Sequence, residues 1–405
     1  MNKEEKKIIG LTSASHSLVH LFEGVLPPLI PLLIGEFGTD YFHLGMVVTV
    51  FSYAFGAGSL PAGFFVDRVG SRRLLSFYLF GASILCIAVW SVQSLLAYGV
   101  IMGFIGLFCS TYHPAGNSLI SLSIREKGRA FGIHGIAGSL GVAVVPVLSA
   151  WLGSFLGWRA PHVALGIVGI GVGLYSLTIS RPTFGKVRNA KDSGEEVPEQ
   201  AISYVNVAVF FLSATALGLT YKGIMTFLPA YMGKRVQLGF MHMDTVALGG
   251  TVATIALLSG AVGQYIAGRL VDFYRAEKIY LVSVLIATAF VFLMAWSSEF
   301  LLIAAAVIYA FFFFSTQTVQ NYILSTYFPR GHQGLGYGIH FFLSFGVGST
   351  AAAAAGYLAD RFGLASVFYF MGFCLIFSSI FVTILVARTQ SIGKELEPSG
   401  AEIQE

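Results

Sequence analysis

Charged residues are scarce in this chain. Only 11% of its 405 residues are Asp, Glu, Lys or Arg, whereas 56% are hydrophobic. Average soluble proteins carry about 25% charged residues, and a chain this poor in charge cannot cover its surface with polar groups. The composition therefore excludes a disordered chain and an ordinary soluble enzyme. It indicates a protein that crosses a membrane several times.

Cysteine is also scarce, and the three cysteines, Cys86, Cys109 and Cys374, each lie alone within an apolar run. This excludes a disulfide scaffold and cysteine-based metal sites, and we interpret all three as packing residues. The chain has no P-loop, no Gly-x-Ser-x-Gly and no His-Glu-x-x-His motif. Its net charge is +4, and its Lys and Arg residues form no basic segment. We therefore predict no enzyme activity, no cofactor, no metal and no nucleic-acid partner.

Long apolar runs occupy most of the sequence. A membrane-spanning helix needs about 20 mostly apolar residues. The sequence predicts an all-α membrane protein with twelve such helices, in two groups of six. The expected spans are 8–34, 41–66, 73–92, 95–122, 131–153, 161–180, 201–232, 244–270, 278–297, 300–327, 335–358 and 364–388.

The positions of Lys and Arg predict the orientation, because cytoplasmic loops retain positive residues. Most of them fall at the termini and in the loops on the same side, so we expect both termini in the cytoplasm, and the protein in the cytoplasmic (inner) membrane. The predicted division is an N-terminal six-helix bundle over 1–180 and a central cytoplasmic loop over 181–200. A C-terminal bundle over 201–390 and a cytoplasmic tail over 391–405 follow.

The two groups of helices repeat one another. Residues 62–67 (AGFFVD) match 267–272 (AGRLVD), and 132–134 (GIH) match 338–340 (GIH) at nearly the same spacing. Further matches in the same order pair His113 with Gln317 and His20 with Lys222. A fixed spacing of this kind is typical of a duplicated unit, so we expect two pseudo-symmetric bundles.

Residues 62–73 (AGFFVDRVGSRR) resemble the signature between the second and third helices of the major facilitator superfamily. Residues 16–31, 112–114 (YHP) and 226–231 (TFLPAY) resemble its fosmidomycin-resistance exporter branch, although that branch usually has an Asp at the position of His20. The resemblance implies a monomeric secondary transporter that works by alternating access. It also implies a cytoplasmic gate that latches and opens, although the same charges also serve as topology determinants. The gate residues are Gly63, Asp67, Arg68, Arg72, Arg73, Asp272, Arg275 and Lys278.

Polar side chains inside the expected spans mark a candidate transport cavity, because ionisable residues in a membrane are costly and usually functional. His16, His20 and Glu23 share one helix face. We hypothesise that they bind protons and that Lys222 faces them, ready to bind an anionic substrate; the alternative is a fixed structural ion pair. The remaining candidates, on the fourth, fifth, tenth and eleventh spans, are His113, Asn117, His134, Gln317, Asn321 and His340.

These patterns predict a proton-coupled secondary transporter of small organic molecules, in contact with protons, its substrate and the lipid bilayer. Export by proton antiport is favoured, from the exporter resemblance and from Gly135, Gly138 and Gly141 on the fifth span, a pattern that resembles the motif of antiporters of the superfamily; plain close packing of helices is the alternative for these glycines. Proton symport of a small organic, carboxylate-like anion is the alternative, suggested by Lys222 and the histidines. A receptor of the same fold that no longer transports is the third reading.

Overall fold

The computed structural model describes residues 1–179, 203–237, 243–327 and 333–396, and every regular element in these ranges is helical. The predicted central loop, 181–200, lies outside the described residues. So do residues 397–405 of the predicted tail, whereas the last helix continues to Leu396.

Twelve described segments are long and apolar enough to cross a membrane, which confirms the number predicted from the sequence. In the N-terminal half the helices are α1 (Lys3–Gly24), α2 (Ile30–Phe37), α3 (Tyr41–Val69), α4 (Ser71–Ala88), α5 (Leu95–Cys109), α6 (Tyr112–Ser123), α7 (Lys127–Leu156) and α8 (Ala160–Leu177). In the C-terminal half they are α9 (Tyr204–Arg235), α10 (Thr245–Leu270), α11 (Ala276–Trp296), α12 (Glu299–Tyr327), α13 (Gln333–Phe341), α14 (Thr350–Phe362) and α15 (Ala365–Leu396).

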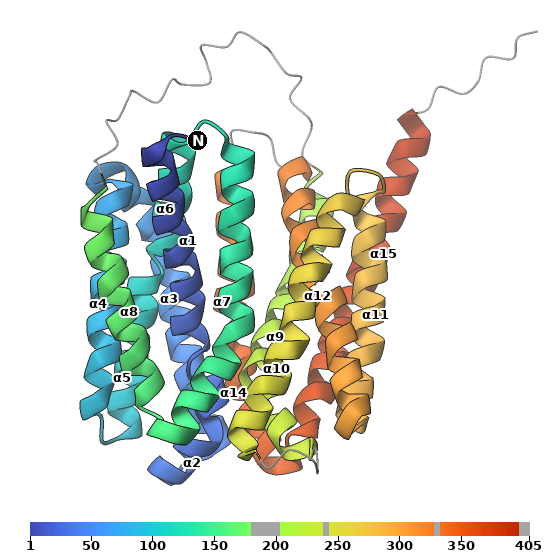
Figure 1. Cartoon of the computed structure of the whole chain (residues 1–405). Coiled ribbons are helices and arrows are strands. Elements are labelled where there is room, and N and C mark those ends of the chain that lie inside the picture. The colour runs from blue at the N-terminus through green and yellow to red at the C-terminus, as the bar shows by residue number, and fades with distance from the viewer. Residues whose placement is uncertain (180–202, 238–242, 328–332, 397–405) are drawn as a thin grey trace, which may run out of the picture.

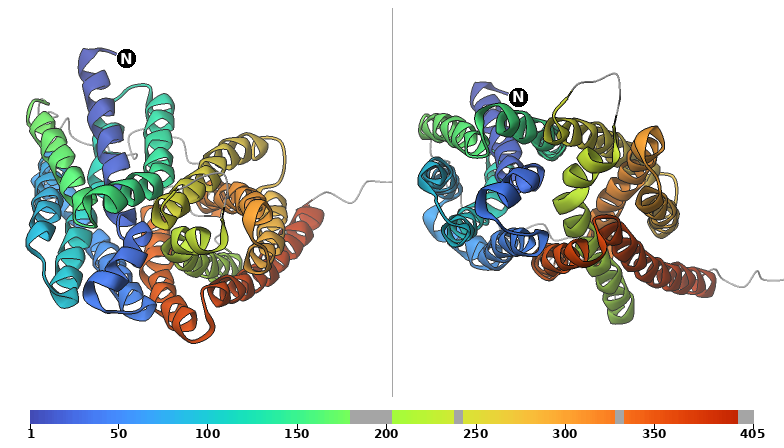
Figure 2. Two further views of the ribbon diagram at one scale, coloured as in Figure 1. Left: turned by 60° about the horizontal axis from the view of Figure 1, so that its bottom comes forward. Right: turned by 90° about the horizontal axis from the view of Figure 1, so that it is seen from below.

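The two halves stand side by side as separate bundles, which confirms the predicted pseudo-symmetric architecture (Figures 1 and 2). They meet where α3 packs against α14 and α7 packs against α10. The bundles are close together on one side of the molecule and spread apart on the other, where α1 begins and α15 ends (Figure 1). We call the spread end the terminal side and the other end the opposite side.

Three of the expected continuous spans are broken. The first span divides at Pro27 and Pro28, and the fourth divides between α5 and α6. Proline has no N–H to continue the helical hydrogen bonds, and Pro27, Pro28 and Pro114 lie at these two breaks. In the fourth span Pro114 leaves the carbonyl of Ser110 without its helical donor, and the hydroxyl of Ser59 lies 3.4 Å from that oxygen. The eleventh span contains a π-helical turn, Phe342–Gly346, between α13 and α14.

On the opposite side the halves touch through backbone. A Cβ atom on Gly45 of α3 would collide with the carbonyl of Ala352, and one on Gly356 would collide with the carbonyl of Tyr41. Glycine thus permits α3 and α14 to approach closely, as small residues do between membrane helices. The repeat-related pair, α7 and α10, makes the same kind of contact at Gly250.

Polar contacts complete this closure. The carboxylate of Asp360 in α14 accepts hydrogen bonds from the backbone N–H groups of Tyr41 and Phe42, at 3.1 and 2.8 Å. At the other pair of helices, the hydroxyl of Ser154 donates to Asp244, at 2.8 Å. Burial alone would raise the pKa of Asp244, but the hydrogen bonds from Ser154 and from backbone N–H groups of α10 hold that pKa below its ordinary value. Two acids therefore help to shut the opposite side. Asp360 of α14 binds the start of α3, and Asp244 lies at the start of α10.

Candidate transport site

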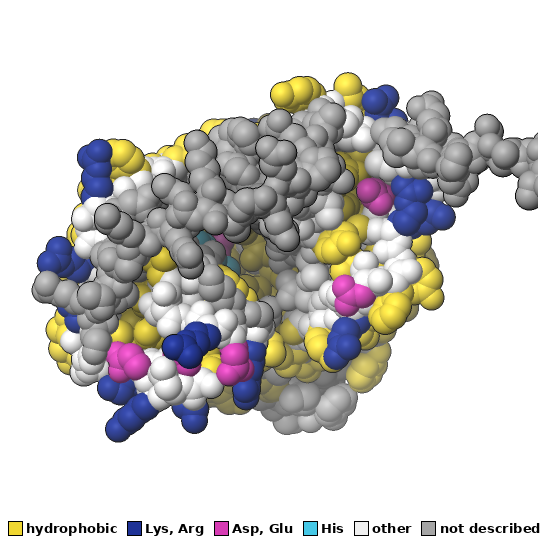
Figure 3. Space-filling view, turned by 90° about the horizontal axis from the view of Figure 1, so that it is seen from above, with side chains coloured by type: hydrophobic (Ala, Val, Ile, Leu, Met, Phe, Trp, Pro, Cys, Tyr) yellow, Lys and Arg dark blue, Asp and Glu magenta, His cyan; other side chains and the backbone are white. Residues whose placement is uncertain are grey.

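A hollow opens between the halves on the terminal side. Figure 3 looks into it and shows histidine and acidic side chains at its base. A cavity of about 560 Å³ at this depth is lined by His20, Glu23 and Lys222, among others. A second cavity of about 570 Å³ is lined by residues of the C-terminal half, and Tyr221 borders both. The hollow thus leads to two adjoining chambers.

An ion pair between the halves lies in the first chamber. The ammonium of Lys222, on α9, donates to one carboxylate oxygen of Glu23, on α1. His20 Nδ1 lies 3.2 Å from the other oxygen of Glu23. The side chains of Lys222 and Glu23 are 5% and 11% exposed, so both charges are largely shielded from solvent. The structure therefore brings together three of the predicted residues, and the pair joins one half to the other.

Aromatic rings surround the ammonium group of Lys222. The ring centroids of Tyr221 and Phe345 lie 5.7 and 5.5 Å from Nζ. A cation over aromatic faces is attracted to them by roughly 0.5–2 kcal/mol. Lys222 is therefore held in place from its own helix and from the π-helical turn of the eleventh span.

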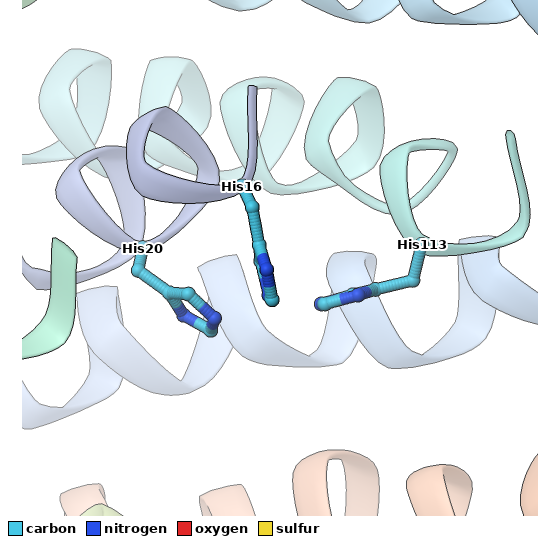
Figure 4. Close-up of side chains that lie close together, drawn as sticks. All are labelled: His16, His20 and His113. Carbon is cyan, nitrogen blue, oxygen red and sulfur yellow. The ribbon is translucent and has the colours of Figure 1, made fainter. Parts of the chain in front are cut away.

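Four histidines gather next to this ion pair. The ring of His16 lies 5.1 Å from that of His20, 5.3 Å from that of His113 and 4.2 Å from that of His134. His16 Nδ1 lies 2.8 Å from the backbone carbonyl of His134. His113 reaches the group from α6, whose start is set by the break in the fourth span. Figure 4 shows His16, His20 and His113 projecting into a shared space.

The packing of α1 against α7 explains two of the predicted antiporter glycines. A Cβ on Gly138 would collide with the ring of His16, and one on Gly141 would collide with the backbone of Ser17. The hydroxyl of Ser17 donates to the carbonyl of Ala137 at 2.7 Å. These two glycines therefore serve close packing. A Cβ on Gly135 would meet no atom within 4 Å among the described residues.

The second chamber contains most of the predicted polar residues of the C-terminal half. Gln317, Asn321 and His340 line it. His340 Nδ1 is buried and has no hydrogen-bond partner among the residues that the structure describes. By contrast, Asn117 is exposed and borders neither chamber.

One functional candidate escaped the sequence analysis. The amide of Gln264 in α10 donates to Gln317 at 3.0 Å and accepts from the hydroxyl of Ser139 in α7, at 2.7 Å. Gln264 thus connects the halves beside the second chamber. A polar amide within an apolar span was the only signal that the sequence offered for it.

The predicted gate residues lie at the spread ends of the helices. Arg72 donates to the carbonyls of Leu177 and Ile179, at 3.2 and 2.9 Å, within its own half. Arg68 stacks on the ring of Phe64. The side chain of Asp67 lies outside the described residues. Gly63, Arg73, Asp272, Arg275 and Lys278 are exposed. No predicted gate side chain that the structure describes bonds to the other half, so the latch stays a prediction for the state in which the terminal side is shut.

Comparison with known proteins decides the family. The sequence profile of the Major Facilitator Superfamily matches residues 12–259 and 242–403. This chain belongs to that superfamily. Among solved structures, the nucleoside transporter NupG superposes with a TM-score of 0.77 over 94% of this chain and 99% of that one, at 12% sequence identity. The protein is thus a multi-pass membrane transporter and not an enzyme.

Curated relatives include transporters named for organic acids. The D-galactonate transporter of Escherichia coli is 20% identical over 395 residues, which cover 88% of this chain and 90% of that protein. The cis,cis-muconate transport protein of Acinetobacter baylyi is 23% identical over 372 residues, 88% of each chain. A probable L-galactonate transporter of Escherichia coli is 26% identical over 254 residues, which span 58% of this chain and only 55% of that relative.

Proposed function

We propose that this superfamily member is a proton-coupled transporter of small organic anions that carry a carboxylate. The observation that carries the proposal is the Lys222–Glu23 ion pair at the base of the open hollow. The relatives named for galactonate and muconate support the same substrate class, because both are organic acids.

Exchange of partners at Lys222 couples the anion to a proton. The carboxylate of the substrate replaces Glu23 as the partner of the ammonium group. An unpaired carboxylate in a desolvated site is costly, so Glu23 takes up a proton when it loses Lys222. His20, 3.2 Å from Glu23, is placed to deliver that proton. One anion and one proton therefore enter the site together, and its net charge is unchanged.

The second chamber provides for the remainder of the substrate. The amides of Gln317 and Asn321 and the imidazole of His340 both donate and accept hydrogen bonds, which suits hydroxyl groups. A polyhydroxylated acid would place its carboxylate at Lys222 and its hydroxyls beyond Tyr221, which borders both chambers.

The asymmetry of the two sides supports alternating access. The opposite side is shut by backbone contacts and by Asp360, whereas the terminal side is open. If the termini are cytoplasmic, as the positive residues predict, this is the state that exchanges substrate with the cytoplasm. Export by antiport is still predicted by the resemblance to the exporter branch. The packing role of Gly138 and Gly141 removes part of the glycine support for antiport, and we favour proton symport.

Transport into reconstituted vesicles tests the proposal. Galactonate, glucarate and muconate are offered to vesicles containing wild-type protein, Lys222→Met or Lys234→Met. Lys234 is the matched control, because it is an exposed lysine on the same helix. We expect a proton gradient to drive accumulation by wild type and Lys234→Met but not by Lys222→Met.

Two results bear against the proposal. Undiminished accumulation by Lys222→Met would remove the ion pair from the mechanism. Symport accumulates the anion when the outside is acidic, whereas antiport does so when the inside is acidic. Accumulation that requires an acidic interior is therefore the second result, and it would contradict symport.

A further inference from the structure

Three imidazoles beside the ion pair offer ligand atoms to one shared space. One ring nitrogen from each of His16, His20 and His113 lies within 4.8 Å of the other two. The three residues come from α1 and α6 and are each partly exposed (Figure 4), and His20 lines the first chamber. Histidine is the commonest side-chain ligand of transition metals.

In two of these rings, those of His16 and His20, Nδ1 already has a partner. His16 Nδ1 lies 2.8 Å from a backbone carbonyl, that of His134, and His20 Nδ1 lies 3.2 Å from the Glu23 carboxylate. Metal-binding histidines almost always have such a carbonyl or carboxylate behind them, since it fixes the ring and leaves the other nitrogen for the ion. Among the residues that the structure describes, Nε2 of neither ring has a hydrogen-bond partner.

The distances fit a metal after small movements. Ligands placed 2.0–2.1 Å from a tetrahedral zinc ion lie about 3.4 Å apart. The three nitrogens lie within 4.8 Å of one another, so their separations must shorten by at most about 1.4 Å to reach that spacing. The charges of Glu23 and Lys222 cancel nearby, so no net positive charge repels a cation.

We propose that His16, His20 and His113 form a binding site for a divalent transition-metal ion such as Zn²⁺, with the fourth position open to the hollow. Three histidines and one open position make up a ligand set that zinc accepts. An ion bound to His20 Nε2 takes the nitrogen that does not face Glu23, so His20 can no longer pass a proton from that nitrogen to Glu23. The metal site itself goes beyond the proposed function, whereas its inhibitory effect rests on that function.

Cobalt titration tests the site without any transport. Purified full-length protein is stripped of metal with a chelator and titrated with Co²⁺, whose visible absorption reports tetrahedral imidazole coordination, and Zn²⁺ is then added to displace it. We expect one Co²⁺ per chain in the wild type. His113→Gln should bind Co²⁺ at least about 10-fold more weakly, because loss of even an outer partner of a ligand costs about 10- to 100-fold.

His43→Gln is the matched control, since His43 is an exposed histidine beside an acid, Asp40, on the opposite side. It should bind Co²⁺ as the wild type does. His20→Gln serves as a second ligand variant, should His113→Gln fail to fold by thermal unfolding. Absence of tetrahedral cobalt absorption in the wild type overturns the proposal, and so does wild-type affinity in a folded ligand variant. Binding is measured directly, so the outcome is independent of whether protons drive transport.

Discussion

Asp360 holds the opposite side shut by bonding to a helix of the other half. Its carboxylate accepts hydrogen bonds from the backbone N–H groups of Tyr41 and Phe42, at the start of α3. Asp360→Ala removes both bonds and the negative charge next to the positive end of the helix. We therefore expect this substitution to shift the protein away from the state seen here, toward one that is open on the opposite side.

The size of the shift follows from the environment of the contact. Acidic side chains at helix N-termini are worth about 0.5–2 kcal/mol. Asp360 is exposed, and solvent screens its charge, so we take about 1 kcal/mol. Since 1.4 kcal/mol corresponds to a factor of ten, the ratio of the two conformations should change about fivefold.

Distances between spin labels measure that ratio. Labels at Arg129→Cys and Phe273→Cys report on the spread ends of α7 and α10, after the partly exposed Cys374 is replaced by serine. Opening of the opposite side is coupled to approach of these ends, so Asp360→Ala should enlarge the population with the short distance.

Asp40→Ala is the matched control. Asp40 accepts from the N–H of His43, at 2.8 Å, and so caps the same helix from within its own half. Asp40→Ala should lower the stability of α3 without changing the ratio of the two conformations. An unchanged distance distribution in Asp360→Ala, or an equal shift in Asp40→Ala, would refute the reasoning.

Three further predictions concern closure and stability. Gly45→Ala forces a methyl group against the Ala352 carbonyl and should destabilise the closed opposite side by about 1–3 kcal/mol, read out with the same labels. Lys222→Met leaves Glu23 without its ammonium partner and should lower the free energy of unfolding by about 3 kcal/mol, whereas adding Glu23→Gln should restore most of it in thermal unfolding. Because the pKa of Asp244 is lowered in the folded protein, its contribution is present above about pH 4 and is lost as the pH falls through the lowered value. The difference in melting temperature between wild type and Asp244→Asn should therefore vanish in acid.

The helices were predictable because a membrane imposes a simple rule of length and apolarity. The breaks in these helices were not predicted, although Pro27 and Pro114 are visible in the sequence. Whether a proline kinks a span or ends a helix depends on what satisfies the freed carbonyl, and that partner, Ser59 for one break, lies on another helix. Local sequence does not contain this information.

The candidate site was predictable as a set of residues but not as a set of contacts. Periodicity placed Glu23 and His20 on one face, yet the pairing of Glu23 with Lys222 depends on how the halves meet. Gln264 was missed, because a single amide in a span has no periodic partner. Arg72 was assigned to the gate from a resemblance, and in this state it binds the end of α8 in its own half.

The proton count on binding tests the central claim most directly. Purified protein in weakly buffered solution is mixed with a carboxylate substrate, and the protons taken up are measured against the anion bound. Exchange of partners at Lys222 predicts one proton per anion in the wild type and none in Glu23→Gln. Equal proton uptake by both proteins would contradict the account.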